Sequence, residues 1–244
     1  MPAASDARVP VADEPRTRAV PDPHAPSAPD RRAPGGEAEL AALSFDELTA
    51  RMRACRVCVE APLGPPLAHE PRPIFRVSAT ARLAVCSQAP GTLAHAAGMP
   101  FRDPSGVRLR AWMGVDEATF YDASRVMIVP MGFCFPGQDA SGGDLPPRRE
   151  CRLAWHDALF AKLPQLELIL SIGQYALDYH LPSRRGQSLT EKVKDWRTIL
   201  ADEGRRRVLP LPHPSWRNNA WLKKHPFFET ELLPALRTEI ARLL

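Results

Sequence analysis

The sequence predicts a three-layer α/β/α fold built on a central, mainly parallel four-stranded sheet. Four short apolar runs have the length and composition of buried strands, at 82–87, 125–130, 166–172 and 207–211. Segments with helical patterns separate these runs, and strands that alternate with helices are typical of a parallel sheet covered on both faces. The chain has 244 residues, 44% of them hydrophobic, which is enough for the core of one such domain.

Composition sets the first 38 residues apart from the rest. Residues 1–38 contain eight of the 27 prolines and no Phe, Trp or Tyr. A segment without aromatic residues buries too little surface to offset its ordering entropy. We therefore expect a disordered Pro/Ala-rich tail at 1–38 and one folded domain at 39–244.

The expected helices follow from caps and apolar spacing. Ser44 and Glu47 have the spacing of a capping box, which predicts a helix from Phe45 onward. Further helices are expected at 105–114, 174–181, 188–200 and 227–244.

Charge and hydropathy narrow the class of protein. The formal net charge of +4 permits nucleic-acid binding without demanding it. The sequence has no run of about 18 apolar residues, so we expect no membrane span. The N-terminus lacks the apolar core of a signal peptide. These features together predict a cytoplasmic protein.

Two loops after predicted strands carry the residues most suited to binding a ligand. In a parallel sheet, ligands bind beyond the carboxyl ends of the strands. The loop at 87–91 contains small residues and is followed by Phe101, whose ring can stack on a planar ligand. The other loop begins with His213, which can donate a hydrogen bond or carry a proton.

These loops resemble motifs of the uracil-DNA glycosylase superfamily. SQAPG at 87–91 with GMPF at 98–101 is similar to motif A of the family 4 enzymes, the iron–sulfur, thermophile-type branch. His-Pro-Ser at 213–215 is similar to motif B. The resemblance extends from about Ala54 to Asn219. It implies a DNA repair glycosylase that hydrolyses the N-glycosidic bond of a flipped-out damaged base, most readily uracil, in base excision repair.

The resemblance also implies roles for individual residues. His213 and Gln88 are the expected catalytic residues, with His95 and Asp103 as further candidates for orienting water. The expected base-binding residues are Ala89, Pro90, Gly91 and Phe101. The expected DNA-binding residues are Arg148, Arg149, Ser215, Trp216, Arg217 and Asn218. Relatives carry a bulky wedge residue at the position of Arg217, so the wedge residue of this chain stays open.

Three positions depart from the family pattern. Gln88 stands where family 4 has an acidic residue, and Ala89 stands where other members of the superfamily have an Asp that positions water. Pro130 stands where family 4 uses an Asn to recognise uracil. The damaged base is therefore open between uracil and a deaminated purine such as hypoxanthine.

Four cysteines match the family 4 spacing. Cys55 and Cys58 form a Cys-x-x-Cys pair, and Cys134 and Cys151 lie 17 positions apart. The resemblance implies that these four ligate a [4Fe-4S] cluster. Spacing alone leaves zinc, or plain thiols without a metal, as alternatives. Cys86 falls in the first predicted strand and is expected in the core.

The expected partner is DNA containing uracil or another deaminated base, bound by a monomer associated with the nucleoid. A second hypothesis is a non-catalytic protein that binds DNA lesions or abasic sites with a degenerate pocket. The missing motif A carboxylate favours this alternative, whereas His213 and Phe101 favour a glycosylase. A third, weaker hypothesis is an iron–sulfur electron carrier or scaffold.

Overall fold

The computed structural model describes residues 36–202, 204 and 206–244. Nearly all of the tail expected at 1–38 therefore lies outside the described residues. The first helix, α1, spans Glu37–Ala42 and crosses the expected boundary at 38, and its Leu40 is buried. Within the described ranges no helix has both the length and the apolar character needed to cross a membrane.

The centre of the fold is a four-stranded sheet in the order β2-β1-β3-β4, in which every neighbouring pair is parallel. Its strands are β1 (Leu83–Cys86), β2 (Val126–Ile128), β3 (Leu168–Ile172) and β4 (Arg207–Leu211). All four predicted strands are thus confirmed, with ends trimmed by one or two residues in the first three. The chain passes from β1 outward to β2 and then returns to β3 on the other side of β1.

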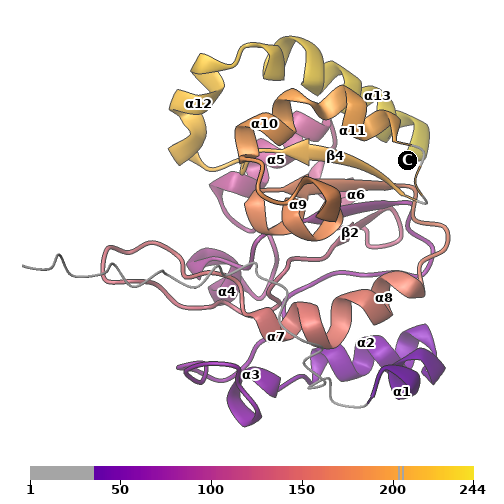
Figure 1. The fold of residues 1–244 in the computed structure, drawn as a ribbon, viewed down its shortest axis with the longest axis vertical. Coiled ribbons are helices and arrows are strands. Elements are labelled where there is room, and N and C mark those ends of the chain that lie inside the picture. The colour runs from indigo at the N-terminus through magenta and orange to yellow at the C-terminus, as the bar shows by residue number, and fades with distance from the viewer. Residues whose placement is uncertain (1–35, 203, 205) are drawn as a thin grey trace, which may run out of the picture.

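Alternate residues of the strands enter two separate cores. On β1, Ala84 and Cys86 face one cluster, whereas Leu83 and Val85 face the other. This alternation follows from the period of two along a strand. Because both faces are apolar, each must be covered by helices, and the predicted three-layer arrangement is confirmed (Figure 1).

The helices divide between the two faces. Residues of α1, α2 (Phe45–Arg53), α8 (Asp157–Ala161) and α9 (Gln174–His180) contribute to the first core. Residues of α5 (Pro104–Met113), α6 (Glu117–Tyr121), α10 (Leu189–Lys194), α11 (Trp196–Ala201) and α13 (Leu233–Leu243) contribute to the second. Ile199 of α11 also packs in the first core. The remaining helices are α3 (Val57–Glu60), α4 (Thr92–Ala97), α7 (Arg149–Cys151) and α12 (Asn219–Lys224).

Most of the expected helices form, with two differences. The capping box is confirmed, because the Ser44 hydroxyl accepts from the Glu47 backbone N–H at 3.2 Å and the Glu47 carboxylate accepts from the Ser44 N–H at 2.7 Å. The single helix expected at 188–200 is wrong in one respect, since it divides at Asp195 into α10 and α11. The helix expected at 227–244 begins with a π-helical turn, Phe228–Leu232, before α13.

Candidate active site

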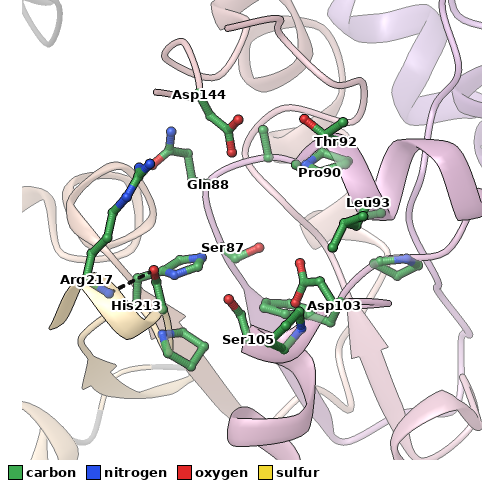
Figure 2. A pocket seen from close by; sticks show the side chains of 18 of the residues that line it. Ser87, Gln88, Pro90, Thr92, Leu93, Asp103, Ser105, Asp144, His213 and Arg217 are labelled. Atoms are coloured by element: carbon green, nitrogen blue, oxygen red, sulfur yellow. Dashed lines mark hydrogen bonds between the residues drawn. The ribbon is translucent and has the colours of Figure 1, made fainter. Parts of the chain in front are cut away.

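A cavity of about 710 Å³ opens at the carboxyl edge of the sheet. Its walls come from the loop after β1, the start of α5, the loop after β2 and the loop after β4. This is the edge at which ligands bind in parallel α/β proteins. Both loops singled out by the sequence, 87–91 and 213–218, line the same cavity (Figure 2).

The loop after β1 is fixed by the loop after β2. Ser87 and Gln88 present their carbonyl oxygens to the N–H groups of Met131 and Gly132, at 2.7 and 2.9 Å. Ala89, Pro90 and Gly91, the expected base-binding residues, all line the cavity. The Gln88 side chain also faces the cavity, with Nε2 3.5 Å from the Leu145 carbonyl oxygen.

Phe101 lies on the lining in an unusual backbone conformation. Its φ is +56°, the left-handed region that non-glycine residues rarely adopt. The Tyr121 hydroxyl donates to the carbonyl oxygens of Pro100 and Phe101, each at 3.1 Å. The Phe101 ring packs edge-on against Phe120 at 6.0 Å between centroids and is mostly buried. Phe101 therefore belongs both to the second core and to the lining of the cavity.

His213 lies two residues beyond the end of β4 and lines the cavity with a partly exposed side chain. Burial lowers its pKa, and the nearby negative charges of Asp103 and Asp144 partly oppose that effect. The imidazole is therefore neutral at pH 7, with one N–H available as a donor. Asn218 steadies the backbone here, because its Nδ2 donates to the His213 carbonyl oxygen at 2.7 Å.

Asp103 and His95, the further candidates for orienting water, have different surroundings. Asp103 lines the cavity and caps α5, where its Oδ1 accepts from the Gly106 N–H at 2.9 Å. His95 does not line the cavity. Its ring packs against His69 at 4.8 Å and Phe135 at 5.5 Å between centroids. The structure therefore brings Asp103 and His213 together and leaves His95 apart.

Two residues of this site were not singled out by the sequence analysis. Asp144 lines the cavity from an irregular loop between β2 and α7, where no motif or periodic pattern marks it. Arg108 joins α5 to the second motif loop, because its guanidinium donates to the Ser215 carbonyl oxygen at 3.1 Å and to Asn219 Oδ1 at 2.8 Å. The sequence places Arg108 on an expected helix, but its hydrogen-bond partners lie more than a hundred residues later in the chain.

The segment Ser215–Asn218 forms the mouth of the cavity. The Ser215 hydroxyl accepts from the Arg217 N–H at 3.2 Å and begins a short helical turn. Trp216 is 72% exposed, the largest exposed fraction among the large hydrophobic side chains described. The guanidinium of Arg217 lies 5.9 Å from the centre of the Trp216 ring. A large apolar side chain in solvent beside a ligand cavity is typical of a binding surface.

Arg148 and Arg149 lie away from this cavity. They line a second, smaller cavity of about 100 Å³ together with Arg152, Tyr175 and Arg185. Arg148 is committed to internal contacts, since it donates to the Pro65 carbonyl oxygen at 2.8 Å and pairs with Glu150. Arg149 is exposed. The two neighbouring arginines thus differ in how much of their charge faces solvent.

The four spaced cysteines converge from three segments. Cys58 and Cys134 share a small buried cluster with Leu67. Cys55 Sγ accepts from the Trp155 indole N–H at 3.2 Å, and Cys151 Sγ accepts from the Phe133 N–H at 3.4 Å. Cys86 is fully buried in β1, as expected.

The thiols influence one another electrostatically. A hydrogen bond with Cys134 lowers the pKa of Cys58 to about 7, and burial raises the pKa of Cys151 to about 12 with Cys55 and Cys58 adding to the effect. The described residues contain no group of three or more His, Cys, Asp or Glu side chains placed to hold a single metal ion. Thiolates are the usual ligands of iron–sulfur clusters, so these four thiols are the residues that would hold such a group.

Residues 75–237 match the family model described as "Uracil DNA glycosylase superfamily". The matched residues include the whole sheet, both motif loops and the last two of the four spaced cysteines. Cys55 and Cys58 precede them.

Proposed function

Because the chain belongs to the uracil DNA glycosylase superfamily, whose members are generally DNA glycosylases of base excision repair, we propose that it excises a flipped-out damaged base, most readily uracil. The observation that carries this proposal is the position of His213 and Phe101 on one cavity of about 710 Å³. A glycosylase needs a space that admits a single extruded base, an aromatic face for it and a polar group aimed at its edge.

The reaction develops charge in two places. As the C1′–N bond breaks, its electron pair leaves with the base, and positive charge grows on the sugar. Neutral His213 can donate a hydrogen bond to the departing base anion, and Gln88 and Ala89 line the same cavity, so their N–H groups are further candidate donors. Preorganised donors of this kind contribute about 10²–10³ in rate each. We assign leaving-group stabilisation as the main catalytic contribution.

Trp216 is the residue we assign as the DNA wedge. An extruded base leaves a gap in the duplex, which glycosylases fill with an inserted side chain. Trp216 is apolar, 72% exposed and at the cavity mouth. Arg217, which occupies the family's wedge position, packs its guanidinium against Trp216 instead. Ser215 and Asn218 hold the turn that presents both side chains.

We assign the phosphate contacts to the arginine-lined second cavity. Arg149, Arg152 and Arg185 surround it, and burial together with repulsion from Arg185 and Arg149 lowers the pKa of Arg152. Gathered positive charge of this kind is stabilised by a phosphate. Arg148 contributes mainly by holding the segment before α7 to Pro65.

We further propose that Cys55, Cys58, Cys134 and Cys151 hold a [4Fe-4S] cluster, as in the family 4 enzymes that the cysteine spacing resembles. The cluster would supply no step of base excision and would cross-link the three segments that carry these cysteines. One of these segments leads directly into Arg149 and the second cavity. We also propose that the protein acts as a monomer on chromosomal DNA in the cytoplasm.

A non-catalytic lesion-binding protein is the second candidate. It is favoured by one observation, the absence of a carboxylate at Gln88 and Ala89. The two functions differ in what happens to the base, because a binding protein leaves the glycosidic bond intact.

Single-turnover assays on oligonucleotides separate the two candidates. Single- and double-stranded substrates carrying uracil or hypoxanthine are incubated with excess protein, and abasic sites are revealed by alkaline cleavage. We expect excision of uracil, reduced about 10²–10³-fold in His213→Ala. Excision of hypoxanthine but not of uracil would show that hypoxanthine is the substrate. Tight binding to uracil or abasic DNA with no excision of any base would establish the binding protein.

A further inference from the structure

The cavity holds a carboxylate that does not come from either motif loop. Asp144, in the loop between β2 and α7, lines the cavity. Its Oδ2 lies only 3.2 Å from the place where a Cβ of residue 91 would stand, so the lack of a side chain at Gly91 makes room for it. Figure 2 shows the Asp144 carboxylate pointing toward the space between Gln88 and Pro90. The carboxylate therefore reaches the same loop in which Gln88 and Ala89 lack one.

The loop that carries Asp144 is closed and braced from within. Asp139 Oδ1 accepts from the N–H groups of Ser141 and Gly143, both at 2.9 Å. The Leu145 N–H donates to the Gly137 carbonyl oxygen at 2.9 Å, which closes the base of the loop. The side chain of residue 144 is therefore held on a short, hydrogen-bonded turn.

Asp144 makes few interactions within the fold. Among the described residues its side chain has one hydrogen-bond partner, the neutral Gln138 Nε2 at 3.3 Å, and no described Lys or Arg forms an ion pair with it. The side chain is exposed to the cavity mouth. Asp103, the other carboxylate on the lining, is committed to capping α5. Both carboxylates accept through Oδ1, and Asp144 is the more exposed of the two, so its Oδ2 is the more accessible to a water molecule.

We propose that Asp144 is a catalytic residue that positions the attacking water and accepts its proton, a role that rests on the proposed glycosylase function. The C1′–N bond breaks and its electron pair leaves with the base. The water oxygen forms the new bond to C1′, and one water proton passes to the Asp144 carboxylate. His213 donates its hydrogen bond to the base anion, which takes a proton from solvent after release.

The position of Asp144 also affects the pKa of His213. The negative charges on Asp144 and Asp103 both act on the partly buried imidazole of His213 and raise its pKa against the larger effect of burial. Arg108 and Arg217 line the same cavity and contribute positive charge. Removing the charge of Asp144 therefore lowers the pKa of His213, which is measurable without any turnover.

The test compares two charge-neutralising variants of equal size. Asp144→Asn keeps the acceptor for Gln138, and Asp103→Asn keeps a residue that caps helices well. Glu229→Gln removes an exposed carboxylate outside the cavity lining and serves as the control. Each full-length protein is assayed for single-turnover excision at saturating enzyme, for affinity to uracil-containing DNA, and for the His213 pKa by NMR.

Asp144→Asn is expected to lose about 10²-fold in the excision rate, to bind DNA at least as tightly as the wild type, and to show a lower His213 pKa. Asp103→Asn is expected to lose much less rate, and Glu229→Gln none. A wild-type rate in Asp144→Asn overturns the inference, and so does an unchanged His213 pKa. If Asp103→Asn is the only impaired variant, the role of positioning the water belongs to Asp103. An inactive wild-type protein instead overturns the proposed function together with this inference.

Discussion

The Cα of Gly106 faces the carbonyl oxygen of Phe101 so closely that a Cβ at position 106 would lie 1.9 Å from that oxygen. Phe101 is left-handed and Gly106 is in the first turn of α5, so a residue of the cavity lining and the start of a helix share one close backbone contact. A side chain introduced at position 106 could not avoid this clash, because the atom it meets belongs to the backbone.

Gly106→Ala is therefore expected to destabilise the protein by about 2 kcal/mol or more, within the range of overpacked sites. It should also weaken excision, because Phe101 must shift. Chemical unfolding and single-turnover excision measure the two effects. The control is Gly64→Ala, since nothing lies within 4 Å of a Cβ at that position. If Gly106→Ala unfolds at the wild-type midpoint, the contact between these residues is not as close as described.

The second prediction concerns pH and His180. Burial lowers the pKa of His180 to about 3, and its Nε2 has no hydrogen-bond partner among the described residues. In the unfolded chain an ordinary histidine titrates near 6.5. Between these values the unfolded state binds the additional proton, so the free energy of unfolding falls as the pH falls below 6.5.

His180→Phe removes this titration and should flatten the loss of stability between pH 6.5 and 4. The difference amounts to up to about 1.4 kcal/mol per pH unit. Urea unfolding at pH 7 and pH 5 measures it. His156, whose burial lowers its pKa to about 4, keeps a residual slope in the variant. An identical pH dependence in variant and wild type would show that His180 is not buried as a neutral group.

Trp216→Ala tests the assigned wedge. The variant should bind duplex DNA more weakly and excise uracil from duplex more slowly, with a smaller effect on single-stranded DNA, where no stack needs to be opened. Its thermal stability should not change, because Trp216 is 72% exposed. Val107→Ala removes another exposed apolar side chain, 60% exposed and outside the cavity lining, and is the matched control. Equal losses on duplex and single-stranded DNA would argue against a wedge.

Arg149→Ala tests the phosphate contacts. Loss of one phosphate contact should reduce the slope of log affinity against log salt concentration by about one unit. Arg148→Ala should instead destabilise the protein, because its guanidinium bonds Pro65 and Glu150, and should change the salt slope less. Fluorescence anisotropy over a salt series measures the slopes. A double variant with the wild-type slope would remove both arginines from the DNA interface.

The cysteine assignment predicts a visible cofactor. Protein purified without oxygen should be yellow-brown and contain iron, and Cys58→Ser or Cys134→Ser should lose both colour and iron. Cys86→Ser changes a fully buried cysteine of β1 and should keep the iron. Elemental analysis also detects zinc in its place. A folded, colourless preparation with neither metal would leave the four cysteines as plain thiols.

The sheet was predictable because its signal is local and strong. Each strand is a short apolar run, and β1 and β3 are buried at every position, as a parallel sheet covered on both faces requires. Short helices such as α4 and α12, six residues each, were not predicted, because fewer than two turns contain too little periodicity to detect. Their formation depends on contacts with the rest of the fold.

The site was predictable only where a motif marked it. His213 and Phe101 were found from their motifs, and both line the cavity. Asp144 was missed because a single aspartate in a Gly-rich loop looks like a turn residue. His95 was included because it follows Gly91 closely in sequence, yet the helix α4 directs its ring toward His69. Sequence proximity therefore fails where a helix begins within the loop.

No single short segment of the chain forms the cavity. Its lining begins at Ser87 and ends at Asn218, and it closes only when β4 has paired with β3. During synthesis the N-terminal segments emerge first, so β1 and β2 can associate long before His213 exists. A nascent or truncated chain therefore presents part of the cavity wall without His213, and the proposed activity begins only once the last strand is in place.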